Sequence, residues 1–414
     1  GLGDVYKRQV HGSGRPDSTG AISPAIYMSS TFTHPGLGET TGFQYTRESN
    51  PTRDRLETLI AGLEEGTDAI AFSSGMAAVD AVFHLFSPGD HVILGDDLYG
   101  GSIRLFTNIY EKNGVEFTYV GTSDLDAVKA AFKPNTKALF GETISNPSLE
   151  VLDIEKFARI AHSHGVPLIV DNTFPTPINC RPFEWGADIV VHSTTKYMDG
   201  HATSVGGCIV DSGNFDWDAH AEKFPGLCTP DESYHGLTYT KAFGKGAYIT
   251  KATAQLMRDL GSIQSPQNSF LLNLGLETLH LRMPQHCRNA QKVAEYLSKN
   301  EKVAWVNYCG LPDNKYYSLA QKYMPNGSCG VISFGLKGGR DVSIKFMDSL
   351  EFIAIVTHVA DARSCVLHPA SHTHRQLTDE QLMEAGVRPD LIRLSVGIEN
   401  ADDIIADIEQ ALNA

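Results

Sequence analysis

Along the first half of the chain, short runs that are apolar throughout alternate with segments whose apolar residues have helical spacing. This order predicts a sheet covered by helices. Short runs that are apolar along their whole length predict buried strands at Asp68–Ser73, His91–Leu94, Val115–Val120, Lys137–Phe140, Val166–Val170 and Asp188–His192. Apolar residues at helical spacing predict helices at 55–63, 76–86, 101–112 and 154–164. This order is typical of a doubly wound α/β domain with a mostly parallel sheet.

The pattern changes after Tyr248. Helical stretches at 249–262 and 271–300 precede strand candidates at 303–308, 330–335 and 391–396 and a helix at 401–412. We predict a large domain over 48–248 and a smaller C-terminal α+β domain over 249–414. Residues 1–47 are predicted to be an N-terminal arm, because 10–47 are rich in Gly, Pro, Ser and Thr, whereas residues 1–9 match no motif.

Composition narrows the class of protein. The 414 residues are 42% hydrophobic, enough for two or three domains, and the formal net charge of −15 disfavours binding to nucleic acid. No apolar run reaches the roughly 20 residues that span a bilayer, and no secretory signal is recognised near the start. The seven cysteines are scattered singly without a C-x-x-C pair, which fits a reducing compartment. We expect a cytoplasmic enzyme of small-molecule metabolism without nucleic-acid or membrane partners.

Three polar features stand at the ends of predicted strands, where open α/β sheets bind ligands. The turn Ser73–Met76 joins a strand to a helix start, which suits a phosphate, although small residues there often serve packing alone. Asp171 directly follows a buried strand, but an Asp there also commonly caps a turn. Lys196 follows the next strand beside hydroxyl residues; a buried lysine is a usable nucleophile and base, whereas most lysines after strands lie on the surface.

One cofactor accounts for all three features together. Pyridoxal 5'-phosphate (PLP) requires a lysine for its Schiff base, an acidic residue opposite its ring nitrogen and an anion site for its phosphate. A nicotinamide-dependent oxidoreductase would share the α/β pattern, but no G-x-G-x-x-G follows the first strand. A catalytically inactive regulatory relative is a further alternative. We predict a PLP enzyme with Lys196 as the Schiff-base lysine.

Seven motifs, in chain order, resemble the Cys/Met-metabolism branch of fold-type I PLP enzymes. They are Gln44–Thr52 (QYTRESNPT), Ser73–Met76 (SSGM), Asp97–Gly101 (DLYGG), Glu142–Pro147 (ETISNP), Val170–Phe174 (VDNTF), His192–Tyr197 (HSTTKY) and Ile392–Glu399 (IRLSVGIE). The resemblance covers nearly the whole chain after the first two dozen residues. It implies a large, mostly parallel-sheet domain and a smaller C-terminal α+β domain.

The resemblance also implies roles for individual residues. Lys196 matches the Schiff-base lysine, which later moves protons between carbons, and Asp171 matches the residue that keeps the ring nitrogen protonated. Tyr99 matches the tyrosine stacked on the ring, where it contacts substrate and helps proton transfer. Arg393 matches the arginine that grips the substrate carboxylate, and Asn146 the residue near the phenolic oxygen and the substrate. Further cofactor contacts are implied for Ser74, Gly75, Met76, Thr173, Ser193 and Thr195.

Two matching residues point to an oligomer. Tyr45 and Arg47 correspond to a pair that reaches the phosphate from the neighbouring subunit. The active unit is then at least a dimer, and we expect a homotetramer built as a dimer of dimers with shared active sites.

No metal site is predicted. His368, His372 and His374 are close in sequence, but no carboxylate or cysteine arrangement matches them. Loop histidines more often bond to backbone or solvent than to a metal.

The two halves of the chain resemble different sub-branches of this family. The second half, through Gly207–Trp217, Ser233–Leu237 and His368–His374, resembles O-acetylhomoserine sulfhydrylases. The segment up to about Lys137 is closer to cystathionine γ-synthases and γ-lyases. Gly101 stands where methionine γ-lyases usually carry a cysteine, and Thr357 where many cystathionine enzymes carry a glutamate.

Our hypothesis for the reaction is γ-replacement, in which O-acetyl-L-homoserine and sulfide give homocysteine and acetate. Lys196 would take the α-proton and then a β-proton, acetate would leave from Cγ, and sulfide would add in its place. The alternatives are cystathionine γ-synthase or γ-lyase activity and the γ-elimination of a methionine γ-lyase.

Overall fold

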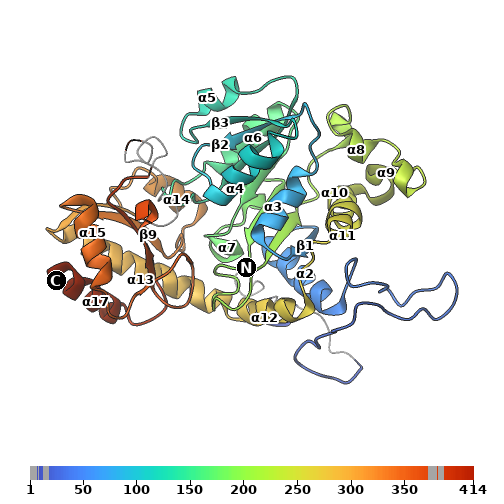
Figure 1. Ribbon diagram of the computed structural model, residues 1–414. Coiled ribbons are helices and arrows are strands. Elements are labelled where there is room, and N and C mark those ends of the chain that lie inside the picture. Colours follow the sequence, from blue (N-terminus) through green and yellow to red (C-terminus); the bar gives the residue numbers. More distant parts are fainter. Residues whose placement is uncertain (1–6, 8, 13–17, 372–379, 381–386) are drawn as a thin grey trace.

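A computed structural model describes residues 7, 9–12, 18–371, 380 and 387–414 of the chain. Figure 1 shows a large sheet with its helices, drawn in blue to yellow, beside a smaller unit in orange and red that contains the C-terminus. None of the described helices combines the length and apolar composition needed to cross a bilayer.

The large sheet has seven strands, in the order β1-β7-β6-β5-β4-β2-β3. They are Asp68–Phe72 (β1), Gly207–Asp211 (β7), Ile189–Ser193 (β6), Leu168–Asp171 (β5), Thr136–Glu142 (β4), His91–Gly95 (β2) and Glu116–Val120 (β3). Strands β2 to β6 run parallel, as predicted, and β7 runs antiparallel to both β6 and β1. The connection 194–206, which the structure describes in full, contains no helix to carry the chain over the sheet, so β7 returns beside β6 in the opposite direction.

Helices cover both faces of this sheet, because its strands are apolar on both sides. Residues Leu168 and Val170 of β5 pack on one face with α2 (Pro51–Glu64) and α6 (Ile154–Ser163). Ile169 packs on the other with α3 (Gly75–Phe83). The remaining α-helices between these strands are α4 (Gly100–Leu105), which runs into a π-helical turn at Phe106–Tyr110, α5 (Leu125–Ala130) and α7 (Thr176–Asn179), and a 3-10 helix follows α7 at Pro182–Trp185.

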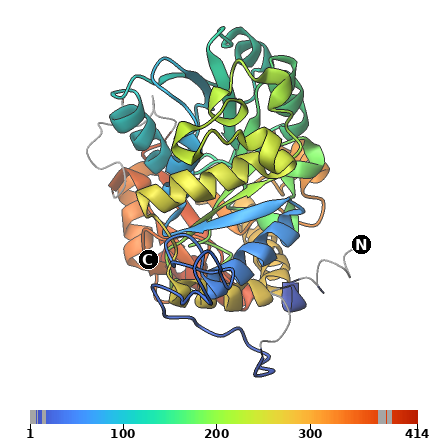
Figure 2. The same cartoon turned by 90° about the vertical axis from the view of Figure 1, so that its right-hand side faces the viewer.

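The helical segment after β7 still packs on the large sheet. It contains α8 (Pro225–Cys228), α9 (Tyr239–Phe243), α10 (Ala247–Lys251), a π-helical turn at Ala252–Met257 and α11 (Arg258–Leu260). Ile249, Ala252 and Met257 belong to the same buried cluster as β1 and β2. In Figure 2 this segment, in yellow, lies across the face of the sheet. The predicted boundary at residue 248 falls inside α10, which packs on the large sheet. The division of the chain at residues 47 and 248 stays a prediction.

The helix predicted as one stretch over 271–300 is two helices. The first, α12, spans Pro266–Glu277, and the second, α13, spans Leu279–Lys299. Ser265 and Pro266 start α12 earlier than predicted, since Ser265 Oγ accepts a hydrogen bond from Asn268 N (3.1 Å) and proline suits the first turn. The helical path breaks at Thr278, whose φ of −109° is outside the α-helical range.

The smaller sheet has five strands, in the order β10-β11-β12-β9-β8. They are Ala354–Ile355 (β10), Cys365–Leu367 (β11), Leu391–Ser395 (β12), Val331–Leu336 (β9) and Val303–Asn307 (β8). Strands β8, β9 and β12 lie where the sequence predicts them. Helices α13, α15 (Gly339–Asp348) and α17 (Ala401–Asn413) bury their apolar faces against this sheet.

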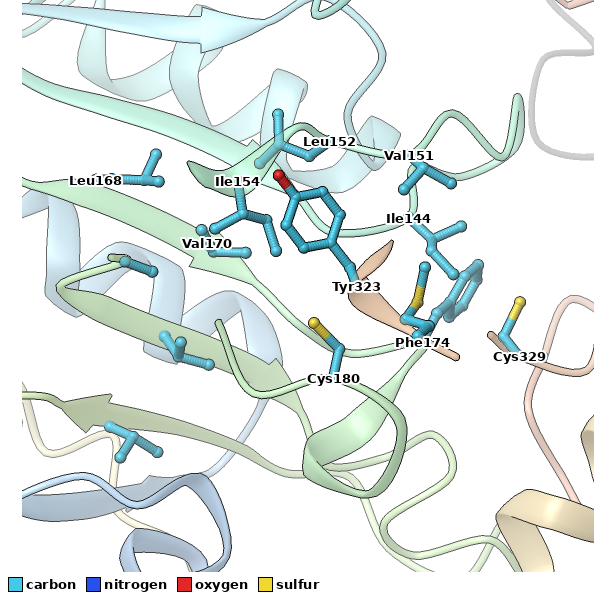
Figure 3. Close-up of a cluster of buried hydrophobic side chains, with 14 of the residues drawn as sticks. Ile144, Val151, Leu152, Ile154, Leu168, Val170, Phe174, Cys180, Tyr323 and Cys329 are labelled. Atoms are coloured by element: carbon cyan, nitrogen blue, oxygen red, sulfur yellow. The ribbon is translucent and has the colours of Figure 1, made fainter. Parts of the chain in front are cut away.

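One buried cluster joins the C-terminal part to the large sheet. Tyr323, from α14 (Tyr317–Tyr323), packs among residues of β5 and α6 such as Val170 and Ile154, as Figure 3 shows. Its hydroxyl donates a hydrogen bond to Asp153, the residue before α6. Cys329 closes the same cluster from the side of β9. This packing fixes how the two sheets face each other.

Candidate active site

A cavity of about 390 Å³ opens at the carboxyl ends of β4, β5 and β6, with β12 and the segment 357–359 on its other side. Every predicted cofactor or substrate residue lines it except Tyr45 and Arg47. The predicted residues in its wall are Ser74, Gly75, Met76, Tyr99, Asn146, Asp171, Thr173, Ser193, Thr195, Lys196 and Arg393. The structure thus brings together residues from distant parts of the sequence, of which Ser74 and Arg393 are 319 positions apart.

One end of the cavity is formed by the start of α3. Ser74 caps this helix, its Oγ accepting from Ala77 N at 3.0 Å, and Gly75 and Met76 contribute first-turn N–H groups that have no intrahelical acceptor. A Cβ added to Gly75 would lie 2.8 Å from Ser193 Cβ, so only glycine lets the helix start approach β6 this closely. The helix dipole and these N–H groups suit an anion.

Asp171 occupies the end of β5, next to this anion site. Its Oδ1 accepts hydrogen bonds from Thr173 N (3.0 Å) and Thr173 Oγ1 (2.5 Å), and Thr173 Oγ1 in turn accepts from Ser193 N (2.9 Å). Burial raises the pKa of Asp171, while the Thr173 hydrogen bonds and the charge of His192 oppose that rise. The carboxylate is therefore held in one orientation from the side of β6.

Lys196 lies in the turn that follows β6, and it lines the cavity. Removal from water lowers the pKa of its amine from 10.5 to about 8, and the nearby positive charge of Arg393 adds to the effect. A much larger fraction of the amine is then neutral near pH 7 than for an exposed lysine. This is the state in which an amine attacks a carbonyl or accepts a proton.

Arg393, on β12, lines the cavity, and among the described residues no negatively charged group accepts a hydrogen bond from its guanidinium. Its guanidinium donates to Asn146 Oδ1 (3.3 Å), Thr357 O (3.0 Å) and His358 O (3.4 Å). None of these three acceptors is ionised. The guanidinium is thus suited to a carboxylate ligand, which it can hold through two parallel hydrogen bonds.

Tyr99 stands at the mouth of the cavity and is 46% exposed. Its backbone N donates to Glu142 Oε1 at 2.6 Å. A Cβ added to Gly101 would lie 2.4 Å from Tyr99 Cε1, so the glycine makes room for the ring. The side chain is accessible to a flat ligand in the cavity.

Glu142 is a site residue that the sequence reasoning missed. It ends β4 as Asp171 ends β5, and it lines the same cavity. Burial, together with the charge of Asp171, raises the pKa of Glu142 well above its usual value. Its place at the end of a buried strand, within the ETISNP motif, is the signal that could have identified it. The other wall residues outside the predicted set are Val79, Ser102, Ile144, Phe174, Val205, Thr357, His358 and Val359.

Tyr45 and Arg47 lie outside the cavity, on the arm before α2. They line a separate hollow of about 420 Å³ with residues 28–30, Thr46, Ile263 and Pro266. The Arg47 guanidinium lies 5.3 Å from the centre of the Tyr45 ring and donates to Arg258 O at 2.6 Å. Within one chain the two residues do not meet the other predicted cofactor contacts, and their role across a subunit boundary stays a prediction.

The histidine cluster is described only in part. His368 Nε2 donates to Pro389 O (2.8 Å) and Nδ1 pairs with Ser371 Oγ (2.8 Å). His372 and His374 lie outside the described residues. Over the part of the chain that the structure describes, no group of three or more His, Cys, Asp or Glu is placed to hold a metal ion.

Comparisons with known proteins agree with this geometry. The family model described as "Cys/Met metabolism PLP-dependent enzyme" matches residues 7–413. The chain is 42% identical to the O-acetyl-L-homoserine sulfhydrylase of Leptospira meyeri over 97% of this chain and 95% of that protein. It is 44% identical to the homocysteine synthase of Schizosaccharomyces pombe, over 98% and 97% of the two chains. The crystal structure of a putative O-acetylhomoserine (thiol)-lyase from Campylobacter jejuni, which contains N'-pyridoxyl-lysine-5'-monophosphate, superposes with a TM-score of 0.95 at 36% identity, covering 99% of this chain and 100% of that one.

Proposed function

The chain belongs to the Cys/Met-metabolism family of PLP-dependent enzymes, and from that premise we propose that it catalyses γ-replacement of O-acetyl-L-homoserine with sulfide, giving L-homocysteine and acetate. The family, the fold class and the cofactor predicted from the motifs are confirmed by this membership. The observation that carries the proposed reaction is a single cavity in which Lys196, Asp171 and Arg393 meet. The sulfhydrylase and homocysteine synthase names of its relatives support this reaction over the lyase alternatives.

The cavity residues fit PLP by their chemistry. The α3 start and Ser193 offer donors for a phosphate, Asp171 offers a carboxylate for the ring nitrogen, and Lys196 offers an amine of lowered pKa. A Cβ on Gly207 would lie 2.2 Å from Ser74 O, so β7 approaches the α3 start only because the residue is glycine. PLP, when bound, supplies an aldehyde that condenses with an amine and a ring that accepts electrons from the carbons beside that amine.

Three side chains of the protein have separate roles in the proposed reaction. Arg393 binds the α-carboxylate of the amino acid as a fork and fixes which bonds face the lysine. Lys196 takes a proton from Cα and then from Cβ, which allows acetate to leave from Cγ. Sulfide forms the new C–S bond at Cγ, and Lys196 returns the two protons to carbon. Tyr99, at the mouth, covers the reacting atoms and helps to transfer these protons.

We also propose that the enzyme is a cytoplasmic homotetramer with shared active sites. The position of Tyr45 and Arg47 outside their own cavity supports sites completed by a neighbouring subunit. All seven cysteines are free, and six of them are buried, which suits a reducing compartment. The size of the assembly is testable by light scattering on the purified protein.

The test of the reaction is a substrate panel with three products recorded together. Purified enzyme is incubated with O-acetyl-L-homoserine and sulfide, and separately with cystathionine or methionine, and homocysteine, cystathionine and keto acids are quantified. Homocysteine from the first mixture is the expected result. Cleavage of cystathionine or methionine to a keto acid, with no homocysteine formed, would replace the proposal with a lyase.

The cofactor linkage has a separate test that does not depend on turnover. Borohydride should abolish the visible absorbance and leave a pyridoxyl mass increment on the peptide that contains Lys196. Lys196→Ala should lack both signals. An increment on another peptide would contradict the assignment.

A further inference from the structure

The ends of β4, β5 and β6 each carry two consecutive polar residues, one in the cavity wall and one buried behind it. Successive side chains of an extended chain point to opposite sides, which explains the pairing. The wall residues are Glu142, Asp171 and Ser193, and their buried neighbours are Thr143, Asn172 and His192. The buried neighbours are no more than 1% exposed. They form a second polar layer that does not touch the cavity.

Hydrogen bonds join this second layer to one side chain, Glu64, the last residue of α2. Thr143 Oγ1 donates to Asn172 Oδ1 (2.9 Å), and Asn172 Nδ2 donates to Glu64 Oε1 (3.2 Å). His192 Nε2 donates to the same oxygen at 2.5 Å. Glu64 therefore adds a side-chain link behind the cavity between the ends of β5 and β6, which the hydrogen bond from Ser193 N to Thr173 Oγ1 joins on the cavity side.

The burial of Glu64 and His192 costs free energy of folding, which a role in stability alone does not explain. Glu64 is 0% exposed and His192 is 1% exposed. Among the described residues, Glu64 Oε2 and His192 Nδ1 have no hydrogen-bond partner. Leaving a buried polar atom without a partner costs about 1–3 kcal/mol, and well-packed apolar side chains of similar volume often give equal or greater stability. A buried pair of this kind is better explained by the geometry that it imposes.

We propose that Glu64 is a positioning residue for the cofactor: by tying Asn172 to His192, it holds their neighbours Asp171 and Ser193 at the separation at which they meet opposite ends of PLP. The inference rests on the proposed cofactor contacts and extends them to a helix outside the cavity.

The experiment measures cofactor affinity and the visible spectrum in two variants at this position. Glu64→Gln keeps the volume and one acceptor oxygen but removes the charge, whereas Glu64→Ala removes both. Apoenzyme is titrated with PLP, and the dissociation constant and the wavelength of the bound band are recorded. We expect Glu64→Ala to weaken PLP binding about tenfold, the equivalent of one buried hydrogen bond, and Glu64→Gln to weaken it less.

Asp211→Asn is the matched control. Asp211 is also a buried carboxyl group, 2% exposed, with one oxygen lacking a partner among the described residues. It pairs in register with Asp68 and Ile189, the first residues of β1 and β6, and so lies at the amino ends of these strands, whereas the cavity lies at the carboxyl ends. We expect this variant to shift the melting temperature while PLP affinity and the absorption band stay unchanged.

The outcomes separate this inference from the cofactor site itself. If Glu64→Ala binds PLP as tightly as the wild type, or if Asp211→Asn weakens binding equally, the inference is overturned. A wild-type apoenzyme that binds no PLP would overturn the cofactor site as well. Adding His192→Asn to Glu64→Ala should weaken binding no further, because the two residues act as one unit. If Glu64→Ala is insoluble, the same comparison is made between Glu64→Gln and His192→Asn, and PLP affinity equal to wild type in both overturns the inference.

Discussion

Glu142 of β4 and Asp171 of β5 are partners in register across two adjacent parallel strands, and both carboxyl groups line the same cavity. Two carboxyl groups in one buried site do not both ionise readily. The pKa of Glu142 is raised by burial and by the charge of Asp171, whereas Asp171 receives two hydrogen bonds from Thr173 that favour its ionised form. Both pKa values are raised by burial, and that of Glu142 the further, so the negative charge of the pair is favoured on Asp171.

This assignment predicts that the two amide substitutions differ. Glu142→Gln should keep PLP binding and most of the activity, because glutamine resembles the protonated acid and still accepts from Tyr99 N. Asp171→Asn should lower kcat by at least about 100-fold, because it removes the charge that, in the proposed site, keeps a proton on the ring nitrogen. Steady-state kinetics and the visible spectrum of both variants test this. Equal losses in the two variants would mean that the charge is not confined to Asp171.

With Lys196 as the proposed Schiff-base lysine, its lowered pKa predicts how the rate at which apoenzyme binds PLP depends on pH. Only the neutral amine condenses with an aldehyde, so the rate constant should rise with pH and level off above the pKa of about 8. The free amine of an exposed lysine would instead continue to gain rate up to pH 10. Stopped-flow absorbance after mixing apoenzyme with PLP at a series of pH values measures this profile. Half-maximal rate near pH 10 would show that the amine is not desolvated in the apoenzyme.

Tyr45 and Arg47 predict complementation between two inactive variants. Arg47→Ala removes the predicted phosphate contact that one subunit makes in its neighbour, and Lys196→Ala removes the lysine of the subunit's own site. In a hybrid dimer of the two, one site has both residues intact. Random reassociation of equal amounts should restore about a quarter of the wild-type activity, because half of the dimers are hybrids with one complete site each. If each subunit supplied its own Arg47, mixing would restore nothing.

The sequence predicts the parallel strands well, since strands buried on both faces are apolar along their whole length. Strand β7 was not predicted, because it follows β6 without an intervening helix and returns antiparallel. Strands β10 and β11 have two and three residues and are too short for any periodicity to show. The helix break at Thr278 was missed because the apolar spacing continues through it.

From the pattern of the sequence alone, only those site residues could be predicted that stand next to the end of a buried strand. Asp171 and Lys196 were predicted from the buried strand that precedes each, and both line the cavity. Arg393 came from the family resemblance alone, since an arginine on a strand carries no local sign of the cavity it faces. The wall segment 357–359 depends on how the smaller sheet packs against the large one, and no pattern within the segment records that packing. The same limit hid Glu64, whose role depends on two strands distant from it in sequence.

Away from the cavity, His162 of α6 predicts a pH-dependent contribution to stability. Its Nε2 donates to Asp188 Oδ2 at 2.7 Å, and this hydrogen bond raises the pKa of His162 above 6.5. A raised pKa in the folded state means that the proton is bound more tightly there. The stabilisation is therefore complete below about pH 6.5 and is lost as the pH rises through the folded-state pKa. Burial raises the pKa of Asp188 above 3.8, so its protonated form also favours the folded state, and this contribution is likewise lost as the pH rises, at a lower pH.

His162→Gln should accordingly destabilise the protein at pH 6 and have a smaller effect at pH 9. Because the side chain of His162 is 41% exposed, solvent screening limits the loss to about 0.5–1 kcal/mol at the lower pH. His164→Gln is the control, since His164 stacks on Phe132 with ring centroids 3.9 Å apart and its Nδ1 bonds to a backbone carbonyl rather than a carboxylate. Thermal unfolding of both variants at the two pH values measures the difference. An equal loss at pH 6 and pH 9 for His162→Gln would show that its contribution comes from packing, because packing does not change when the imidazole loses its charge.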